Sequence, residues 1–182
     1  MIRALSKRPY QLRHGFTLLE LMVVTAIIAI LVSVGSVAFL SQRGAAKEDR
    51  ARADLQVIQQ GLEAYKARFG DYPKIPDIYP DPKITTEEEY LLNALCGQIG
   101  PIGEVISGAG IPAMLNTSLL TYAKPGLPLS DLQKNSIVDP WGTDYDYDYR
   151  PDDGSWKIFG YELRSAGPDK SLDTEEDNIE AQ

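Results

Sequence analysis

The chain has 182 residues, enough for one globular domain and one further segment. Its formal net charge at pH 7 is −8; residues 1–15 hold four basic side chains and no acidic one, so the remainder carries −12. Nucleic-acid binding requires a basic surface that neutralises phosphates, so this acidic body predicts no nucleic-acid partner.

A single histidine and a single cysteine narrow the chemistry further. His14 lies among the first 15 residues, and Cys96 has no second cysteine with which to form an internal disulfide. Without residues 1–15 the chain would have no imidazole, the commonest general base and metal ligand. We therefore predict that the protein is not an enzyme and that Cys96 is a buried apolar side chain.

An uncharged apolar segment runs from Leu21 to Gln42. About 20 helical residues at roughly 1.5 Å each span the hydrocarbon core of a bilayer. Basic residues precede the segment, and such residues hold their end of a span in the cytoplasm. The pattern predicts one transmembrane helix with the C-terminal body on the outer side. A secretory signal peptide fits less well, because its cleavage site would follow the apolar run.

One acidic residue, Glu20, stands at the start of this segment, in the motif Gly-Phe-Thr-Leu-Leu-Glu of residues 15–20. A carboxylate at the edge of a bilayer is costly and usually functional. Cleavage after Gly15 would give Phe16 a free amino group, with Glu20 one helical turn further on. Pairing with that amine, in its own chain or in a neighbouring subunit, would offset the desolvation of Glu20. The alternative is a plain membrane anchor with a glutamate in the headgroup region.

The motif of residues 15–20 resembles the prepilin cleavage site of the type IV pilin and type II secretion pseudopilin superfamily. The resemblance implies that a prepilin peptidase cuts between Gly15 and Phe16 and methylates the new amine of Phe16. It also implies that Glu20 directs the addition of subunits to a growing filament. We therefore expect a prepilin leader peptide at residues 1–15, a transmembrane and assembly helix at 16–42, and a periplasmic globular head at 43–182.

Apolar side chains continue at helical spacing beyond the uncharged segment. They are Leu55, Ile58, Leu62, Tyr65 and Phe69. The glycine and proline of residues 70–73 end the pattern, because glycine takes the left-handed cap and proline cannot continue the helix. The sequence predicts one long helix from about Phe16 to Phe69, whose second half packs on the head. A coiled-coil partner is the alternative use of this apolar stripe.

The middle of the chain, residues 74–135, is rich in turn-forming Pro and Gly. A helix is predicted over residues 85–95, because threonines and three glutamates suit its start and Gly97 suits its end. Residues 98–135 are predicted to be an irregular insertion with a further short helix near residues 111–120. Its role is either a subunit contact or a surface decoration.

Tyrosine and aspartate alternate strictly over residues 144–149, which is typical of a β-strand. A turn at residues 151–154 and a return strand at 156–163 complete a predicted β-hairpin. Its tyrosine face is expected to cover the apolar stripe of the helix, with a sugar-stacking surface as the alternative. The predicted fold is therefore α+β and pilin-like: a long N-terminal helix, half transmembrane and half amphipathic, packed on a small C-terminal antiparallel β-sheet.

The segment Asp-Pro-Trp-Gly-x-x-Tyr-x-Tyr at residues 139–147 resembles a signature of the major pseudopilins, and residues 163–179 resemble their calcium loop. Ca²⁺ binds six to eight oxygen atoms. The resemblance implies bound Ca²⁺, with ligands from the main-chain carbonyl of Leu163, the hydroxyl of Ser165 and the carboxylates of Asp169, Asp173 and Asp177. Glu176 is an alternative ligand, and Lys170 stands where the family usually has glycine. A solvated acidic tail is the competing interpretation.

The resemblance covers residues 13–73 and 139–179, and it is strongest to the major pseudopilins of type II secretion systems. It implies a structural subunit that forms a homopolymer in the periplasm and works with minor pseudopilins, prepilin peptidase and an inner-membrane secretion platform. The expected location is the inner membrane, crossed once, with the C-terminal head in the periplasm and later in a pseudopilus. The alternatives are a type IV pilin of a surface pilus, a minor pseudopilin and a membrane-anchored polysaccharide-binding protein.

Overall fold

The computed structural model of the chain describes residues 16–101, 103–106, 111–126, 129, 131–149, 160–174 and 176–181. The chain divides into two compact units between Gln42 and Arg43. One unbroken helix, α1 (Leu18–Phe69), contributes to both units. It confirms the long helix predicted from Phe16 to Phe69.

In the first unit, the large apolar side chains of residues 16–32 face outward on all sides of α1. Their exposed fractions range from 46% at Val24 to 82% at Phe16. Within the residues that the structure describes, no helix meets the length and apolarity needed to cross a membrane. The transmembrane role predicted for residues 16–42 stays a prediction.

In the second unit, α1 buries one stripe of side chains. Ala51, Leu55, Ile58, Leu62 and Tyr65 are at most 1% exposed, and their spacing of three or four residues matches the helical period. The helix ends where the amide of Gly70 donates to the carbonyl of Lys66 and Gly70 adopts a φ of 91°. The apolar pattern therefore forms the core face of the head, as predicted.

The second helix, α2 (Glu87–Leu95), ends at the predicted residue and begins two residues after the predicted start at 85, with Thr86 as its N-cap. The hydroxyl of Thr86 accepts a hydrogen bond from the amide of Glu89 at 3.3 Å, while the Glu89 carboxylate accepts from the amide of Thr85 at 2.8 Å. Two amide donors at the helix start are satisfied in this way. Gly97 follows the helix with a φ of 78°, the left-handed conformation expected at its end.

The middle segment is more ordered than predicted. Strands β1 (Thr121–Tyr122) and β2 (Ile137–Val138) form an antiparallel pair, and the short helix expected near residues 111–120 is only the 3₁₀ turn η1 (Thr117–Leu119). The side-chain amide of Asn93 both donates to and accepts from the main chain of Gln133, at 2.9 and 3.0 Å. This side-chain pairing attaches the segment to α2, and no sequence periodicity indicated it.

The C-terminal sheet has three antiparallel strands in the order β3-β4-β5. They are β3 (Asp146–Asp148), β4 (Glu162–Ser165) and β5 (Ile179–Glu180). Tyr147 lies opposite Leu163, which confirms that the tyrosine strand pairs with a return strand. In the described residues that strand is Glu162–Ser165, and its pairing with β5 carries it two residues past the predicted end at 163. The predicted turn at 151–154 and residues 156–159 lie outside the described residues.

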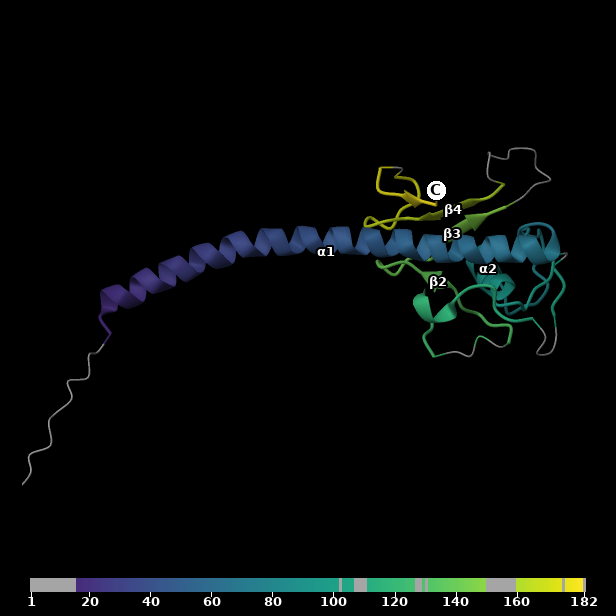
Figure 1. Cartoon of the computed structure of the whole chain (residues 1–182), viewed down its shortest axis with the longest axis horizontal. Coiled ribbons are helices and arrows are strands. Elements are labelled where there is room, and N and C mark those ends of the chain that lie inside the picture. Colours follow the sequence, from purple (N-terminus) through teal and green to yellow (C-terminus); the bar gives the residue numbers. More distant parts are fainter. Residues whose placement is uncertain are drawn as a thin grey trace, which may run out of the picture. The chain divides into compact units, whose positions relative to one another are not determined.

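The tyrosine face of β3 is buried, as predicted, and its hydroxyls have specific acceptors. Tyr147 donates to the carbonyl of Pro73 at 2.8 Å and Tyr149 to the carboxylate of Asp71 at 2.6 Å. This burial overturns the alternative of a sugar-stacking surface for the tyrosines of residues 145–149. In the view of Figure 1, β3 and β4 lie above the second half of α1 and β2 lies below it.

Candidate functional site

The N-terminus of α1 is capped by reciprocal hydrogen bonds between Thr17 and Glu20. The carboxylate of Glu20 accepts hydrogen bonds from the amide and the hydroxyl of Thr17, both at 2.9 Å. The Thr17 hydroxyl in turn accepts from the amide of Glu20 at 3.2 Å. This capping box places a negative charge beside the unsatisfied amides of the helix N-terminus, where it is stabilising.

The same geometry brings the Glu20 carboxylate next to the cleavage position predicted from the sequence. Thr17, whose amide it binds, directly follows Phe16, and Phe16 is 82% exposed. Cleavage would therefore create the new amine at the residue directly before Thr17, whose amide already binds the Glu20 carboxylate. Gly15 lies outside the described residues, so the processing roles of Gly15 and Phe16 and the assembly role of Glu20 stay predictions.

The Asp-Pro-Trp-Gly segment forms a turn around one buried carboxylate. Asp139 is 2% exposed, and its Oδ1 accepts hydrogen bonds from the amides of Trp141 and Thr143, both at 2.9 Å. Its Oδ2 accepts from the hydroxyl of Ser165 at 2.7 Å. Gly142 completes the turn with a φ of 84°. Asp139 thus ties this turn to the end of β4, a role that the sequence did not reveal.

The acidic loop, residues 166–178, starts from this contact. The amide of Gly167 donates to the Ser165 hydroxyl at 3.1 Å, and Gly167 has a φ of 69°. A Cβ at Gly167 would lie 2.1 Å from the carbonyl oxygen of Asp177, so the two ends of the loop touch. Lys170 has a φ of 63°, a conformation that favours glycine and fits the glycine usual at this position in the resembling family.

The predicted calcium ligands have varied surroundings. The carbonyl of Leu163 accepts from the amide of Ala181 at 3.0 Å, and the Ser165 hydroxyl donates to Asp139. The carboxylates of Asp169, Asp173 and Asp177 are exposed, and that of Asp169 accepts from the amide of Ser171 at 3.0 Å. In the described part of the chain, no three acidic, histidine or cysteine side chains come together as a metal site.

One further oxygen in this loop was not predicted. The side-chain oxygen of Asn178 is buried without a hydrogen-bond partner among the described residues, although its amide nitrogen donates to the carbonyl of Leu172 at 3.1 Å. A buried oxygen without a donor loses free energy unless a cation or a water satisfies it. No spacing rule would have selected Asn178, because its burial depends on how the loop folds back.

A second buried acid lies on α1. Asp54 is 3% exposed, and its carboxylate contacts the guanidinium of Arg50 at 2.8 Å and the hydroxyl of Tyr145 at 3.3 Å. Burial raises the pKa of Asp54, against the opposing effects of the Arg50 charge and the Tyr145 hydroxyl. Asp54 is three residues from Ala51 and four from Ile58, so helical spacing alone would have placed it on the core face.

Two comparisons with known proteins bear on this chain. Residues 11–36 match the family described as the prokaryotic N-terminal methylation motif. The chain is also similar to proteins called type II secretion system core protein G. That of Escherichia coli (strain K12) is 27% identical over 91% of this chain and 88% of that protein.

The corresponding protein of Pectobacterium carotovorum subsp. carotovorum is 26% identical, over 91% of this chain and 82% of its own length. That of Dickeya chrysanthemi is 24% identical, over 91% and 84%. No solved structure matches the chain. The motif and the relatives together confirm the predicted resemblance to the type IV pilin and type II secretion pseudopilin superfamily.

Proposed function

We propose that this chain is a major pseudopilin, the structural subunit that polymerises into the periplasmic filament of a type II secretion system. The observation that carries the proposal is that one chain combines an N-terminal methylation motif with similarity to core protein G over 91% of its length. The first feature alone indicates only a prepilin-like start. The second extends through the head and favours the secretion filament over a surface pilus.

Maturation would begin at the start of α1. A prepilin peptidase would remove residues 1–15 and methylate the amine of Phe16. The Glu20 carboxylate accepts a hydrogen bond from the Thr17 amide at 2.9 Å, so it lies near the position of that amine in its own chain. It would pair either with this amine or with the amine of a neighbouring subunit. Such pairing would relieve the cost of an unpaired carboxylate in a dry helix bundle.

Assembly would use both units of the chain. The apolar side chains of residues 16–32 would be covered by lipid before assembly and by other copies of the helix afterwards. Residues 16–42 would cross the inner membrane once, with the head in the periplasm. Non-closing contacts between copies would produce a helical filament, which minor pseudopilins and the inner-membrane platform would help to start and extend.

Replacing the carboxylate tests this function. Glu20→Val should leave the full chain in the membrane fraction and abolish filaments, because the helix stays apolar while the amine loses its partner. The matched control is Glu48→Val on the same helix, since the Glu48 carboxylate lies 3.5 Å from the guanidinium of Arg52 in an exposed pair. Electron microscopy of overexpressing cells should show filaments for the wild type and for Glu48→Val, and none for Glu20→Val. Normal filaments from Glu20→Val would contradict the proposed role of Glu20.

We also propose that Ca²⁺ binds the acidic loop. The supporting observations are its exposed carboxylates, the contact between Gly167 and Asp177 at its two ends, and the buried oxygen of Asn178. Ca²⁺ would offset the mutual repulsion of these carboxylates and so stabilise the head. The melting temperature of the soluble fragment, residues 44–182, should rise with calcium and fall with a chelator. Equal melting temperatures would exclude the site.

A further inference from the structure

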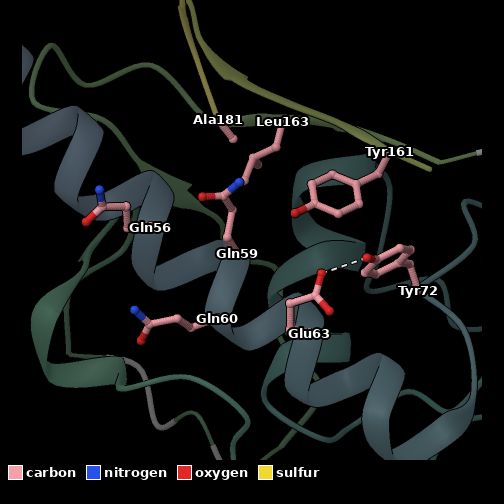
Figure 2. A pocket seen from close by; sticks show the side chains of 8 residues that line it. All are labelled: Gln56, Gln59, Gln60, Glu63, Tyr72, Tyr161, Leu163 and Ala181. Carbon is pink, nitrogen blue, oxygen red and sulfur yellow. Dashed lines mark hydrogen bonds between the residues drawn. The ribbon is translucent and has the colours of Figure 1, made fainter. Parts of the chain in front are cut away.

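A groove of about 550 Å³ lies between the second half of α1 and the strands β4 and β5. Figure 2 shows the side chains that line it. The polar ones among the described residues are Gln56, Gln59, Gln60, Glu63, Tyr72 and Tyr161. We call this cavity the glutamine groove. Its volume lies within the range of pockets that hold small molecules.

Two glutamines project from the exposed surface of α1 at the groove. Gln56 and Gln60 are four residues apart, which places them on the same face of the helix, and both are exposed. Each amide offers donors and an acceptor without carrying charge. A smaller adjoining cavity of about 110 Å³ shares Gln56 and Gln59 and is lined by the β5 residue Glu180. The groove therefore continues along β5.

The aromatic end of the groove is held in place by contacts within the head. The hydroxyl of Tyr72 donates to the carboxylate of Glu63 at 2.6 Å. The rings of Tyr72 and Tyr161 meet edge to face, with centroids 4.7 Å apart and planes at 74°. These contacts fix the rings before any ligand arrives, which lowers the entropic cost of binding.

We propose that the glutamine groove binds a neutral saccharide. Each sugar hydroxyl both donates and accepts hydrogen bonds, as the glutamine amides do, while the C–H face of a sugar ring packs on an aromatic side chain. Leu163 and Ala181 supply apolar surface opposite the helix. A phosphate or carboxylate ligand is disfavoured, because Glu63 is the charged side chain among the described residues that line the larger cavity.

This inference goes beyond the proposed function, since one copy of the chain suffices for binding. Each copy in a filament would nevertheless present the same groove. Repetition of a weak site along a filament multiplies its avidity for a long polysaccharide. The ring that would pack on the sugar is that of Tyr161, which is half-buried, whereas Tyr72 and the tyrosines of residues 145–149 are buried. An extended peptide from a second copy is the rival occupant, because glutamines also bind main-chain amides.

Saturation-transfer difference NMR on the full chain in detergent micelles tests the proposal, with N,N′-diacetylchitobiose and cellobiose as the probes. Wild type should give saturable signals from the ring protons of at least one disaccharide. The double variant Gln56→Ala with Gln60→Ala should weaken binding roughly tenfold or more, since two pairs of hydrogen bonds are removed. Arg68→Ala, which lies on the same helix but outside the groove lining, is the control and should bind as wild type does.

Absence of saturable binding by wild type, or equal binding by the double variant, would overturn the proposal. The proposal would also be overturned if the groove were protected from solvent in filaments and single copies bound no disaccharide. The groove would then be a contact between subunits. None of these results depends on whether Glu20→Val forms filaments. The saccharide site and the secretion function can therefore fail separately.

Discussion

Apolar side chains of the same kind are exposed in the first half of α1 and buried in its second half. Leu31, in the first unit, is 66% exposed, whereas Leu62, in the head, is fully buried. One uninterrupted helix carries both, so local helical structure does not distinguish them. The difference is that the head supplies its own covering layer, whereas under the proposed function lipid or other subunits would cover the apolar side chains of the first unit.

Their acidic residues differ in the same way. Glu20 is exposed and binds the helix start through Thr17, whereas Asp54 is buried and binds Arg50 and Tyr145. The partners of Asp54 are complete within the head. Among the described residues, the Glu20 carboxylate is bound by Thr17, and under the proposed function it would also pair with the amine that processing creates. The acid of the head is therefore satisfied within one molecule, whereas the acid of the first unit fits the contacts between molecules that the proposed function requires.

The largest expected effect comes from a matched pair of leucine truncations on this helix. Leu62→Ala should lower the free energy of unfolding of the head by roughly 2–5 kcal/mol, because it leaves a cavity in a close-packed core. Leu31→Ala should change it by less than about 0.5 kcal/mol, as an exposed site does. Thermal unfolding of the full chain in detergent, followed by near-ultraviolet circular dichroism of the head aromatics, measures both. Equal losses would contradict the division between the two halves.

A pair of glycine substitutions sharpens the contrast within the head. Gly167→Ala combines a left-handed backbone with a Cβ placed 2.1 Å from the carbonyl oxygen of Asp177 and should cost roughly 2 kcal/mol or more. Gly142→Ala has a similar φ of 84° but no atom within 4 Å of the new Cβ. It should cost only about 1 kcal/mol. Urea unfolding of residues 44–182 compares them, and a smaller loss for Gly167→Ala would exclude the close contact between the loop ends.

Elements with a local signal were predictable from the sequence. The period of the apolar stripe gave α1, and the threonines and glutamates of residues 85–89 gave the start of α2. The first signal repeats over about four helical turns, and the second is contained within two. The alternation over residues 144–149 likewise gave the buried tyrosine face, because a strand directs successive side chains to opposite sides.

Features that depend on distant segments were not predictable. The two-residue strands β1, β2 and β5 are too short to show alternation, and nothing in their own residues identifies the strand with which each one pairs. The link between Asp139 and Ser165 joins residues 26 positions apart. Neither partner carries a sign of the other, so the sequence did not reveal that Asp139 is a buried acid that accepts three hydrogen bonds.

The same limit applied at the glutamine groove, which combines one face of α1 with the far end of the chain. Gln56 and Gln60 looked like ordinary solvated helix residues, and only Tyr161, Leu163 and Ala181 opposite them make a cavity. At the start of α1, by contrast, the motif spans six consecutive residues, so it could be recognised from the sequence alone. Features made by neighbouring residues were therefore predictable, and features made by distant segments were not.

The smallest expected effect concerns the buried acid of the head. Because burial raises the pKa of Asp54, the folded state holds the proton of this carboxyl more tightly than the unfolded state does. The stabilisation from protonation is fully present below the ordinary pKa of an aspartate and is lost as the pH rises through the raised value. Asp54→Asn removes this dependence. The variant should therefore gain stability relative to wild type as the pH rises from 3.5 to 7.

Thermal unfolding of residues 44–182 across that range gives the difference between the two proteins at each pH. Asp131→Asn, an exposed acid, controls for the loss of one negative charge from the head. A difference that stays constant with pH for Asp54→Asn would mean that the pKa of Asp54 is the same in the head as in the unfolded chain. The contrast with Glu20 would then fail, because Asp54 would no longer be an acid whose protonation is coupled to burial inside a single subunit.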